Sequence, residues 1–364
     1  MMQNNRPYFP NLDALRFFAF LLVFISHIVL FILDGKLFLA QGDLGVRFFF
    51  VLSGFLITYL LYFEKENTAG LINLKKFYKK KALRILPVLF ITLLLAFIIG
   101  RLKLENLPFI VDLQIRDLPW FLGFASNFYL IHFTNISASI AILWAVSVEE
   151  QFYIIWAPFV AYVKKQNVYT LLILIIILST IFRFINADNS NQVLYSSFSV
   201  ASDLAIGSLF GLLAFSKEDF IPKITKYFSI KNVTLLYAII ASVIYIKMFP
   251  LKFIPAIFMN VYTAILPIII STLFAFVILE QNYSNSSLFK AGKNKYTTYL
   301  GKISYGLYAY HMIAIALTFS ILKSLNINSR ILITIFSFVF TILISHLSFK
   351  YVENKILKFK NRVS

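Results

Sequence analysis

Residues 11–27 read NLDALRFFAFLLVFISH, an apolar segment that carries Asp13, Arg16 and His27. A segment of this length and apolarity predicts a helix that crosses a membrane. Arg16 and His27 are eleven residues apart, about three helical turns, so they share one face and lie roughly 16 Å apart along the axis. Because ionisable side chains at membrane depth are costly and usually mark function, this helix is predicted to contribute to a functional site.

The composition supports a membrane protein and excludes a soluble globule. Of the 364 residues, 60% are hydrophobic and 14% are charged, whereas soluble domains carry about 25% charged residues. The apolar segments are continuous rather than alternating, which predicts an all-α, polytopic transmembrane helical bundle and disfavours a β-barrel. The net charge of +18 is interpreted as positive charge on cytoplasmic loops rather than as a nucleic-acid surface. The absence of cysteine excludes disulfides, thiolate zinc sites and a cysteine nucleophile.

Eleven apolar segments are candidate spans. They lie near residues 14–34, 44–62, 84–101, 119–133, 141–163, 168–185, 198–215, 233–249, 254–279, 299–322 and 330–352. The positive-inside rule places two lysine-rich stretches in the cytoplasm. These stretches are residues 64–83 and the C-terminal tail, which carries Lys355, Lys358, Lys360 and Arg362.

These two cytoplasmic stretches require an even number of spans and put both termini in the cytoplasm. We therefore expect ten spans in the cell (inner) membrane. The exception is residues 119–133, a short segment with Pro119, Gly123 and Asn127, which we expect to be re-entrant or to lie on the outer surface. Residues 74–84 interleave lysines with apolar residues and predict a helix at the interface before the third span. Residues 1–364 are expected to form a single domain.

Ionisable residues recur at one predicted depth. His27, Glu149, Asp203 and His311 each fall roughly 20 Å from the inner end of their segments. Glu150 is turned about 100° from Glu149, so at most one of these two carboxylates is expected to face His27. Each residue has an alternative interpretation as an interhelical hydrogen-bonding group, and for His311 that interpretation is favoured. No function is expected for His132 and His346.

A basic cluster precedes the third span and has two interpretations. It contains Lys79, Lys80, Lys81 and Arg84. Such a cluster serves topology or binds anionic lipid in many membrane proteins. Alternatively it recognises a phosphorylated cofactor, for which Arg84 beside Pro87 is well placed.

Five ordered stretches of the sequence carry distinctive residue patterns. The first stretch is residues 11–27, with Arg16 and His27 separated by ten residues. The others are LGVRFFFVLSGFLIT (44–58), FYKKKALRILP (77–87), WAVSVEEQFYIIW (144–156) and SYGLYAYH (304–311). In this order the five stretches resemble one known family, the integral-membrane acyltransferases that O-acetylate surface polysaccharides, peptidoglycan, antibiotics and lipids. The resemblance covers residues 12–353. Two departures are Lys81 in place of the first arginine of an arginine-x-x-arginine pair, and Asn354 in place of a proline after Glu353.

The resemblance implies an O-acetyltransferase that uses cytoplasmic acyl-CoA, most simply acetyl-CoA, and no metal. It makes His27 the catalytic base or the acyl carrier, and makes Glu149 or Glu150 the group that orients its imidazole. The donor phosphates would be held by Arg16, Lys81 and Arg84. The remaining pocket residues would be Asp13, Ser53, Gly54, Asp203 and His311.

The expected acceptor is a hydroxyl of a cell-surface glycan or glycolipid, surrounded by membrane lipid. Many members of this family carry an extracytoplasmic domain. The sequence ends at Ser364 without one, so we expect direct delivery to the acceptor or transfer through a separate partner protein.

Two other classes of function remain open from the sequence. A proton-coupled transporter would use His27, Glu149 and Asp203 as a relay. A non-catalytic subunit of a polysaccharide assembly machine would not need His27.

Overall fold

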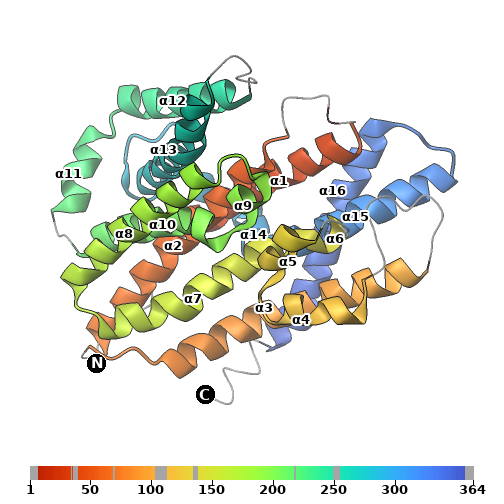
Figure 1. Ribbon diagram of the computed structural model, residues 1–364, viewed down its shortest axis with the longest axis horizontal. Helices are drawn as coiled ribbons and strands as arrows, with labels where there is room; N and C mark the ends of the chain where they lie inside the picture. The colour runs from red at the N-terminus through yellow and green to blue at the C-terminus, as the bar shows by residue number, and fades with distance from the viewer. Residues whose placement is uncertain are drawn as a thin grey trace. The chain divides into compact units, whose positions relative to one another are not determined.

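The computed structural model describes residues 7–33, 35, 40–68, 70–102, 113–133, 138–216, 219–248 and 255–356. Within these ranges the chain is helical and contains no strand (Figure 1). The prediction of an all-α helical bundle is therefore confirmed. Lys358, Lys360 and Arg362 of the predicted basic tail lie outside the described residues.

Ten helical segments in the described ranges are long and apolar enough to cross a membrane, as the sequence predicts. Their main helices are α1 (Pro10–Phe31), α2 (Gly42–Asn67), α3 (Leu74–Arg101), α7 (Trp144–Tyr162), α8 (Lys165–Ile185), α10 (Ser197–Ser216), α12 (Ile230–Met248), α13 (Ala256–Tyr283), α15 (Ser304–Ser324) and α16 (Arg330–Ser348). The shorter elements are α4 (Leu118–Leu122), α5 (Ser126–His132), α6 (Ala138–Ala141), α9 (Ser190–Tyr195), α11 (Phe220–Tyr227), α14 (Lys295–Lys302), the 3₁₀ turns η1 (Ile115–Asp117) and η2 (Ala291–Lys293), and the π-helical turn η3 (Phe349–Glu353).

Large apolar side chains on several spans face outward. Ile173, Leu178 and Ile185 of α8 are exposed. In α12, only 6% of the apolar stretch that could cross a membrane is buried inside the protein. Exposure of such apolar surfaces to water is unfavourable, whereas contact with lipid tails is not. The outward apolar surface thus supports a multi-pass membrane protein.

The segment predicted not to cross forms two short helices, α4 and α5, instead of a span. Gly123 ends α4, and Phe124 adopts a positive φ of 53° in the turn between the helices. Ser126 at the start of α5 is buried, and its Oγ lies 2.7 Å from Oγ of Ser147 in α7. The breaker residues therefore interrupt the apolar segment as the sequence predicts.

The basic helix before the third span continues into that span. A single helix, α3, begins after Asn73, whose side chain accepts a hydrogen bond from the amide of Lys76 at 2.8 Å. The sequence predicted an interfacial helix over residues 74–84 followed by a span, but lysine, leucine and alanine all favour helix. No residue between the two parts ends it.

The described residues divide into two compact units. Unit 1 takes in the chain up to Ala19, Val46–Ile72 and Gln151–Thr298, and unit 2 takes in Phe20–Gly45, Asn73–Glu150 and the chain from Tyr299 onward. Helices α1, α2 and α7 each contribute residues to both units.

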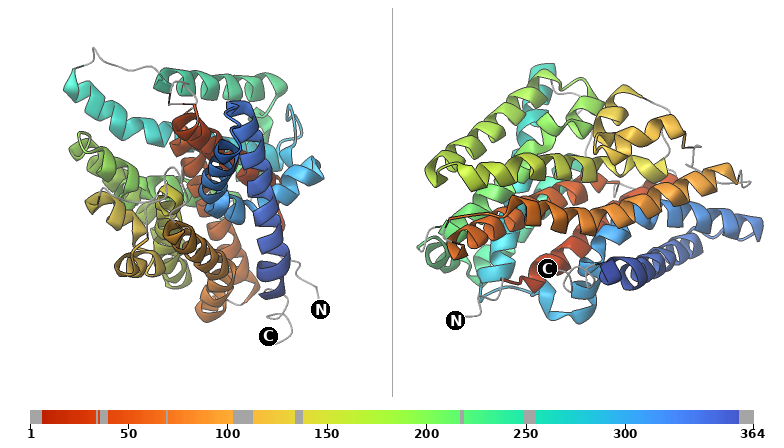
Figure 2. Two further views of the ribbon diagram at one scale, coloured as in Figure 1. Left: turned by 90° about the vertical axis from the view of Figure 1, so that its right-hand side faces the viewer. Right: turned by 90° about the horizontal axis from the view of Figure 1, so that it is seen from below.

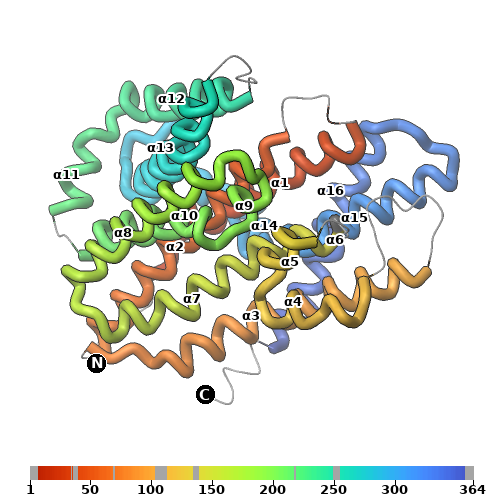
Figure 3. The backbone as a smooth tube through the Cα atoms, in the orientation of Figure 1, coloured from red at the N-terminus to blue at the C-terminus, as the bar shows by residue number. Residues whose placement is uncertain are grey.

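Unit 1 is built on mutual packing of α8, α10 and α13, with α12 against α13 (Figure 3). Helices α2 and α10 approach closely through glycines. A Cβ at Gly207 of α10 would lie 2.9 Å from Cα of Val51, and a Cβ at Gly54 of α2 would lie 3.0 Å from the amide nitrogen of Ser208. Small residues at such a crossing let two membrane helices pack backbone to backbone.

The start of α1 is also fixed within unit 1. The side chain of Asn11 donates to the carbonyl of Gln281 at 2.8 Å, and its oxygen accepts from the amide of Gly292 at 2.8 Å. Lys290 lies in the loop after α13 and donates to the carbonyl of Gln281 at 2.6 Å, and burial lowers the pKa of its ammonium group. These bonds hold the first turn of α1, which carries Asp13.

Unit 2 is built around α15, which packs against α16, α3 and α6 (Figure 2). The hydroxyl of Tyr305 at the start of α15 donates to the carbonyl of Ile85 in α3 at 3.2 Å. One turn later, the hydroxyl of Tyr308 donates to the carbonyl of Ile142 at 2.8 Å. The π-helical turn η3, which follows α16, contacts α3.

Candidate functional site

The structure brings His27 of α1 and His311 of α15 into direct contact inside unit 2. Nε2 of His311 lies 3.1 Å from Nδ1 of His27, and the ring centroids are 5.0 Å apart. Nδ1 of His311 lies 2.6 Å from the carbonyl oxygen of Tyr308. We call these two residues the histidine pair.

Aromatic rings surround the histidine pair. Phe20 packs edge-on against His311, with centroids 5.9 Å apart, and Phe24 packs at 6.4 Å. Phe31 stacks on His27 at 6.0 Å. His311 is fully buried. Because these neighbours are apolar and His311 is closed to solvent, hydrogen bonds in the pair are stronger than they would be in water.

A second group of ionisable residues lies in unit 2, and we call it the charged cluster. It consists of Lys81 and Arg84 of α3, Glu149 and Glu150 of α7, and Glu353 of η3. The charges of Lys81, Arg84 and Glu149 act on the carboxylate of Glu150, and the charge of Arg84 acts on Glu353. Two cations and three carboxylates therefore meet within electrostatic range of one another.

Within the charged cluster, the cations and the carboxylates differ in exposure. Arg84 is exposed and Lys81 is half-buried, so both can reach a ligand. Glu150 is buried, and its Oε1 accepts no hydrogen bond from any residue in the described ranges. The cluster therefore offers accessible positive charge over buried negative charge.

Sequence reasoning missed Glu353, which was considered only as part of a helix terminus. Glu353 is buried, and its Oε1 accepts a hydrogen bond from the hydroxyl of Ser348 at 3.4 Å. Ser348 in turn contacts the hydroxyl of Tyr310 at 2.9 Å. The available signal was a carboxylate one residue beyond an apolar span, in the stretch that resembles the family.

Helix α15 links the charged cluster to the histidine pair. The charges of Glu149, Glu150 and Glu353 act on Tyr305, and His311 follows Tyr305 by six residues. At 1.5 Å per residue this is about 9 Å of helix. Tyr305, which donates to the carbonyl of Ile85 next to Arg84, and His311 therefore share one helix.

Two further predicted residues pair with each other at the start of α1, in unit 1. Nη1 of Arg16 lies 3.2 Å from Oδ1 of Asp13, one turn earlier. Asp13 therefore provides a local counter-charge for Arg16. Both side chains remain partly accessible, at 11% for Arg16 and 16% for Asp13.

Ser53 and Gly54 lie on α2 in unit 1. The close approach expected at Gly54 exists, and the partner is α10, whose Ser208 hydroxyl donates to the carbonyl of Gly54 at 3.2 Å. Ser53 is buried. Helix packing is therefore sufficient to account for glycine at position 54.

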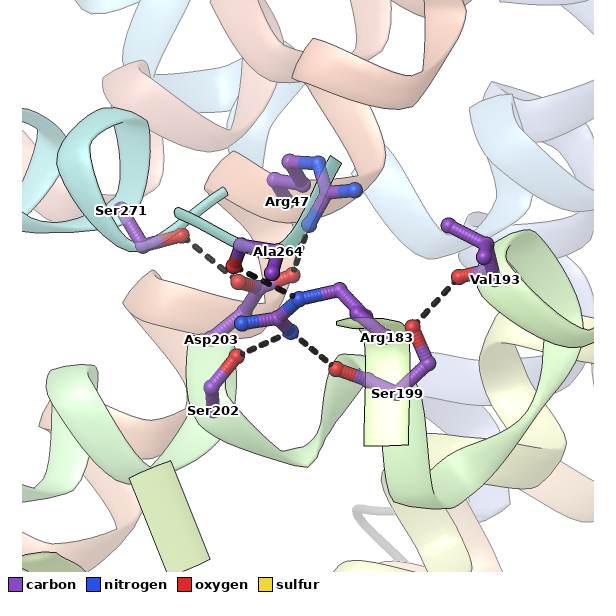
Figure 4. A network of polar contacts seen from close by, with 8 residues as sticks. All are labelled: Arg47, Arg183, Val193, Ser199, Ser202, Asp203, Ala264 and Ser271. Carbon is purple, nitrogen blue, oxygen red and sulfur yellow. Dashed lines mark hydrogen bonds and ion pairs between the residues drawn. The ribbon is translucent and has the colours of Figure 1, made fainter. Parts of the chain in front are cut away.

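Asp203 belongs to a buried polar network in unit 1 (Figure 4). Its Oδ2 accepts from Nη1 of Arg47 at 2.8 Å, and its Oδ1 accepts from the hydroxyl of Ser271 at 2.8 Å. Arg183 donates to the carbonyl of Ala264 at 3.1 Å, to the hydroxyl of Ser202 at 2.8 Å and to the carbonyl of Ser199. Neither arginine was predictable as a partner from the sequence, because pairing across helices depends on the rotation of each helix about its axis.

The remaining histidines lie apart from the histidine pair. His132 is exposed at the end of α5, and Nδ1 of His346 lies 2.6 Å from the hydroxyl of Tyr299. Among the residues that the structure describes, no group of three or more histidine, aspartate or glutamate side chains could hold a metal ion.

A multi-span helical protein with a histidine pair and a mixed charged cluster in one unit has groups that an integral-membrane enzyme can use. The chain belongs to the family described as "Acyltransferase domain", whose model matches residues 9–349. The family resemblance and the predicted acyltransferase class are thereby confirmed.

Curated relatives of this chain include named O-acetyltransferases. "Peptidoglycan O-acetyltransferase OatA" of Listeria monocytogenes is 27% identical over 374 residues, which cover 97% of this chain and 56% of the relative. "O-acetyltransferase OatA" of Staphylococcus aureus is 28% identical over 377 residues, which cover 96% of this chain and 57% of the relative. The chain thus spans rather more than half the length of these relatives. No solved structure matches it.

Proposed function

We propose that this chain transfers an acetyl group from cytoplasmic acetyl-CoA to a hydroxyl of a cell-surface glycan or glycolipid, in the cell (inner) membrane with both termini in the cytoplasm. The observation that carries the proposal is the histidine pair, which packs against aromatic rings and shares α15 with Tyr305, whose hydroxyl donates to the carbonyl of Ile85 next to Arg84. The name of the Listeria relative supports a cell-wall glycan as the acceptor class.

In this proposal the charged cluster binds the donor. Lys81 and Arg84 hold the phosphates of acetyl-CoA through charge-assisted hydrogen bonds. The pantetheine arm then extends along α15 and brings the thioester to His27. Arg16 is a further candidate for phosphate contact, with Asp13 as its counter-charge.

His27 supplies the reactive nitrogen. As a general base it takes the proton of the acceptor hydroxyl while the hydroxyl oxygen attacks the thioester carbonyl. The carbon–oxygen bond forms, the carbon–sulfur bond breaks, and the proton is returned to the leaving thiolate to give CoA. As an acyl carrier, the same nitrogen would attack first and pass the acetyl group on to the hydroxyl.

The glutamates of α7 are assigned to the donor end of the site. From the sequence, Glu149 or Glu150 was expected to orient His27. Because Lys81 and Arg84 act on Glu150, we propose instead that the two carboxylates balance and position these cations. The imidazole of His27 has a direct partner in His311.

The alternative transporter function is less well supported. A relay through Asp203 requires a carboxylate that can exchange protons. Arg47 and Ser271 each donate to one oxygen of Asp203, so both carboxylate oxygens have partners on neighbouring helices. We therefore propose a structural role for Asp203 in joining α2, α10 and α13.

The proposal is tested by mass spectrometry of cell-surface glycans and glycolipids from cells that carry the wild-type chain, His27→Ala or no chain. We expect O-acetyl groups with the wild-type chain and their loss with His27→Ala at equal protein level. The matched control is His132→Ala, which removes an exposed histidine and should keep full acetylation. Acetylation that persists with His27→Ala would overturn the assignment of His27.

A further inference from the structure

We infer that His311 is a positioning residue that fixes the tautomer of His27, so that His27 reacts through Nε2. This inference rests on the proposed function and deepens it, because it names the reacting atom and the group that selects it. It depends on four hydrogen-bonding atoms whose roles can be assigned one after another.

The first assignment is the proton on His311. Its Nδ1 lies 2.6 Å from the carbonyl oxygen of Tyr308. A carbonyl oxygen only accepts hydrogen bonds, so Nδ1 of His311 must carry a hydrogen and donate it. In a neutral imidazole with hydrogen on Nδ1, the other nitrogen carries a lone pair and only accepts.

The second assignment is the charge of His311. A doubly protonated His311 would place a positive charge in a fully buried position beside Phe20 and Phe24. Burial of an ion without a paired counter-ion is strongly unfavourable. The group within hydrogen-bonding distance of Nε2 is the imidazole of His27, which is not a carboxylate and so provides no negative charge. His311 is therefore neutral, and its Nε2 is an acceptor.

The third assignment follows for His27. Its Nδ1 lies 3.1 Å from Nε2 of His311, and two lone pairs facing each other at that distance would repel. Nδ1 of His27 must therefore carry the hydrogen and donate it.

With Nδ1 committed as a donor, Nε2 of neutral His27 holds the lone pair. Nε2 is then the atom that takes the hydroxyl proton or attacks the thioester. When Nε2 gains a proton or an acetyl group, the positive charge spreads over the ring, and the hydrogen bond from Nδ1 to His311 becomes charge-assisted and stronger. His311 thus stabilises the reacting state more than the resting state, which is the condition for raising the rate.

The geometry also excludes His311 as the base. One of its nitrogens donates to Tyr308, and the other accepts from His27. Tyr308 completes the arrangement, because its hydroxyl is bonded to the carbonyl of Ile142. The position of the His311 ring is thereby tied to the chain segment that leads into α7.

The test compares two nearly isosteric amides at position 311. In His311→Gln the amide oxygen can reach the place of Nε2 and accept from His27. In His311→Asn the shorter side chain can reach only the place of Nδ1, so the acceptor facing His27 is lost. The measurements are kcat and the KM for acetyl-CoA, with each variant purified in detergent and checked for a monodisperse elution profile.

We expect His311→Asn to lower kcat at least tenfold with a KM for acetyl-CoA within about twofold of wild type, since general-base catalysis contributes about 10²- to 10⁴-fold. His311→Gln should recover a large part of that kcat. The matched control is His346→Gln, which replaces a histidine bonded to Tyr299 in the same unit and should leave kcat unchanged.

Equal kcat in His311→Asn and wild type would overturn the inference. So would equal loss in the Asn and Gln variants, or a change confined to KM. These outcomes differ from failure of the proposed function, which would appear as full activity in His27→Ala. If His27→Ala is inactive while His311→Asn keeps wild-type kcat, the function stands and the positioning role of His311 is wrong.

Discussion

At the scale of single residues, the polar side chains at membrane depth fall into separate roles. His27 and His311 bond to each other, whereas Asp203 bonds to Arg47 and Ser271. Each such residue is costly in a membrane unless it is paired. The structure therefore separates the histidine pair, for which we propose a role in chemistry, from Asp203, for which we propose a role in joining helices.

The first prediction concerns Arg84. Removal of one charge-assisted hydrogen bond costs about 1.5 to 3 kcal/mol, so Arg84→Ala should raise the KM for acetyl-CoA roughly tenfold or more. Acetyl-pantetheine carries no nucleotide phosphates, and its KM should be unchanged by the same substitution. Steady-state kinetics with both donors would measure the difference.

The control for Arg84 is Lys75→Ala, which removes an exposed charge from the start of the same helix. It should leave both KM values near those of wild type. If Arg84→Ala altered only the KM for the acceptor, the donor would not bind at the charged cluster.

The sequence predicts candidate residues for the site, but it does not predict their partners. Counting residues along each span gives the depth of a side chain in the membrane, and this count predicted similar depths for His27 and His311. Depth does not give the rotation of each helix about its axis, so the direct contact of the pair and the role of Arg47 were not predictable. Glu353 was missed because it follows an apolar segment and had been assigned to its end.

At the scale of elements, glycines determine how α2 and α10 meet. The spacing of Gly207 and Gly211 is the small-xxx-small pattern, and both face the backbone of α2. Asp203 lies one turn before Gly207 on α10, so this crossing also brings Asp203 to Arg47. Packing and ion pairing in unit 1 are therefore linked.

The second prediction tests that crossing. Gly207→Ala would place a methyl group 2.9 Å or less from the backbone of Val51, so the helices must separate. Such overpacking typically costs about 1 to 3 kcal/mol, and the melting temperature in detergent should fall.

The matched control is Gly306→Ala in α15. There the added Cβ would lie 3.4 Å from Cβ of Ser345, an ordinary contact. Its melting temperature should stay close to that of wild type. Equal melting temperatures for Gly207→Ala and wild type would show that the close α2–α10 packing is not required.

Element boundaries were predictable where the sequence contains breakers. Pro119 and Gly123 mark the two short helices α4 and α5, and the prediction that this segment does not cross is in agreement with the structure. The continuity of α3 was not predicted, because a change from lysine-rich to apolar composition was taken as a boundary. Lysine and the apolar residues that follow it both favour helix, so the change in composition does not end α3.

At the scale of the whole molecule, the lysine-rich stretch after α2 predicts orientation in the membrane. The chain contains no cysteine, so a single introduced cysteine reports on one position. Asn67 at the end of α2 and Asp188 after α8 are both exposed. Asn67→Cys should resist a membrane-impermeant thiol reagent in intact cells, whereas Asp188→Cys should react.

Membrane disruption is the control for accessibility. After permeabilisation both cysteines should be labelled equally. Labelling of Asn67→Cys but not Asp188→Cys in intact cells would reverse the orientation and place the charged cluster outside the cytoplasm, away from acetyl-CoA.

The most direct test of the central claim uses the purified chain in sealed vesicles that also contain cell-wall glycan acceptors. Acetyl-CoA labelled in the acetyl group is supplied only to the face that carries Asn67, and the label on the glycan is counted. We predict ester-linked label with the wild-type chain and none with His27→Ala. Label that crosses the membrane without joining any acceptor, or equal glycan labelling by His27→Ala, would contradict the account.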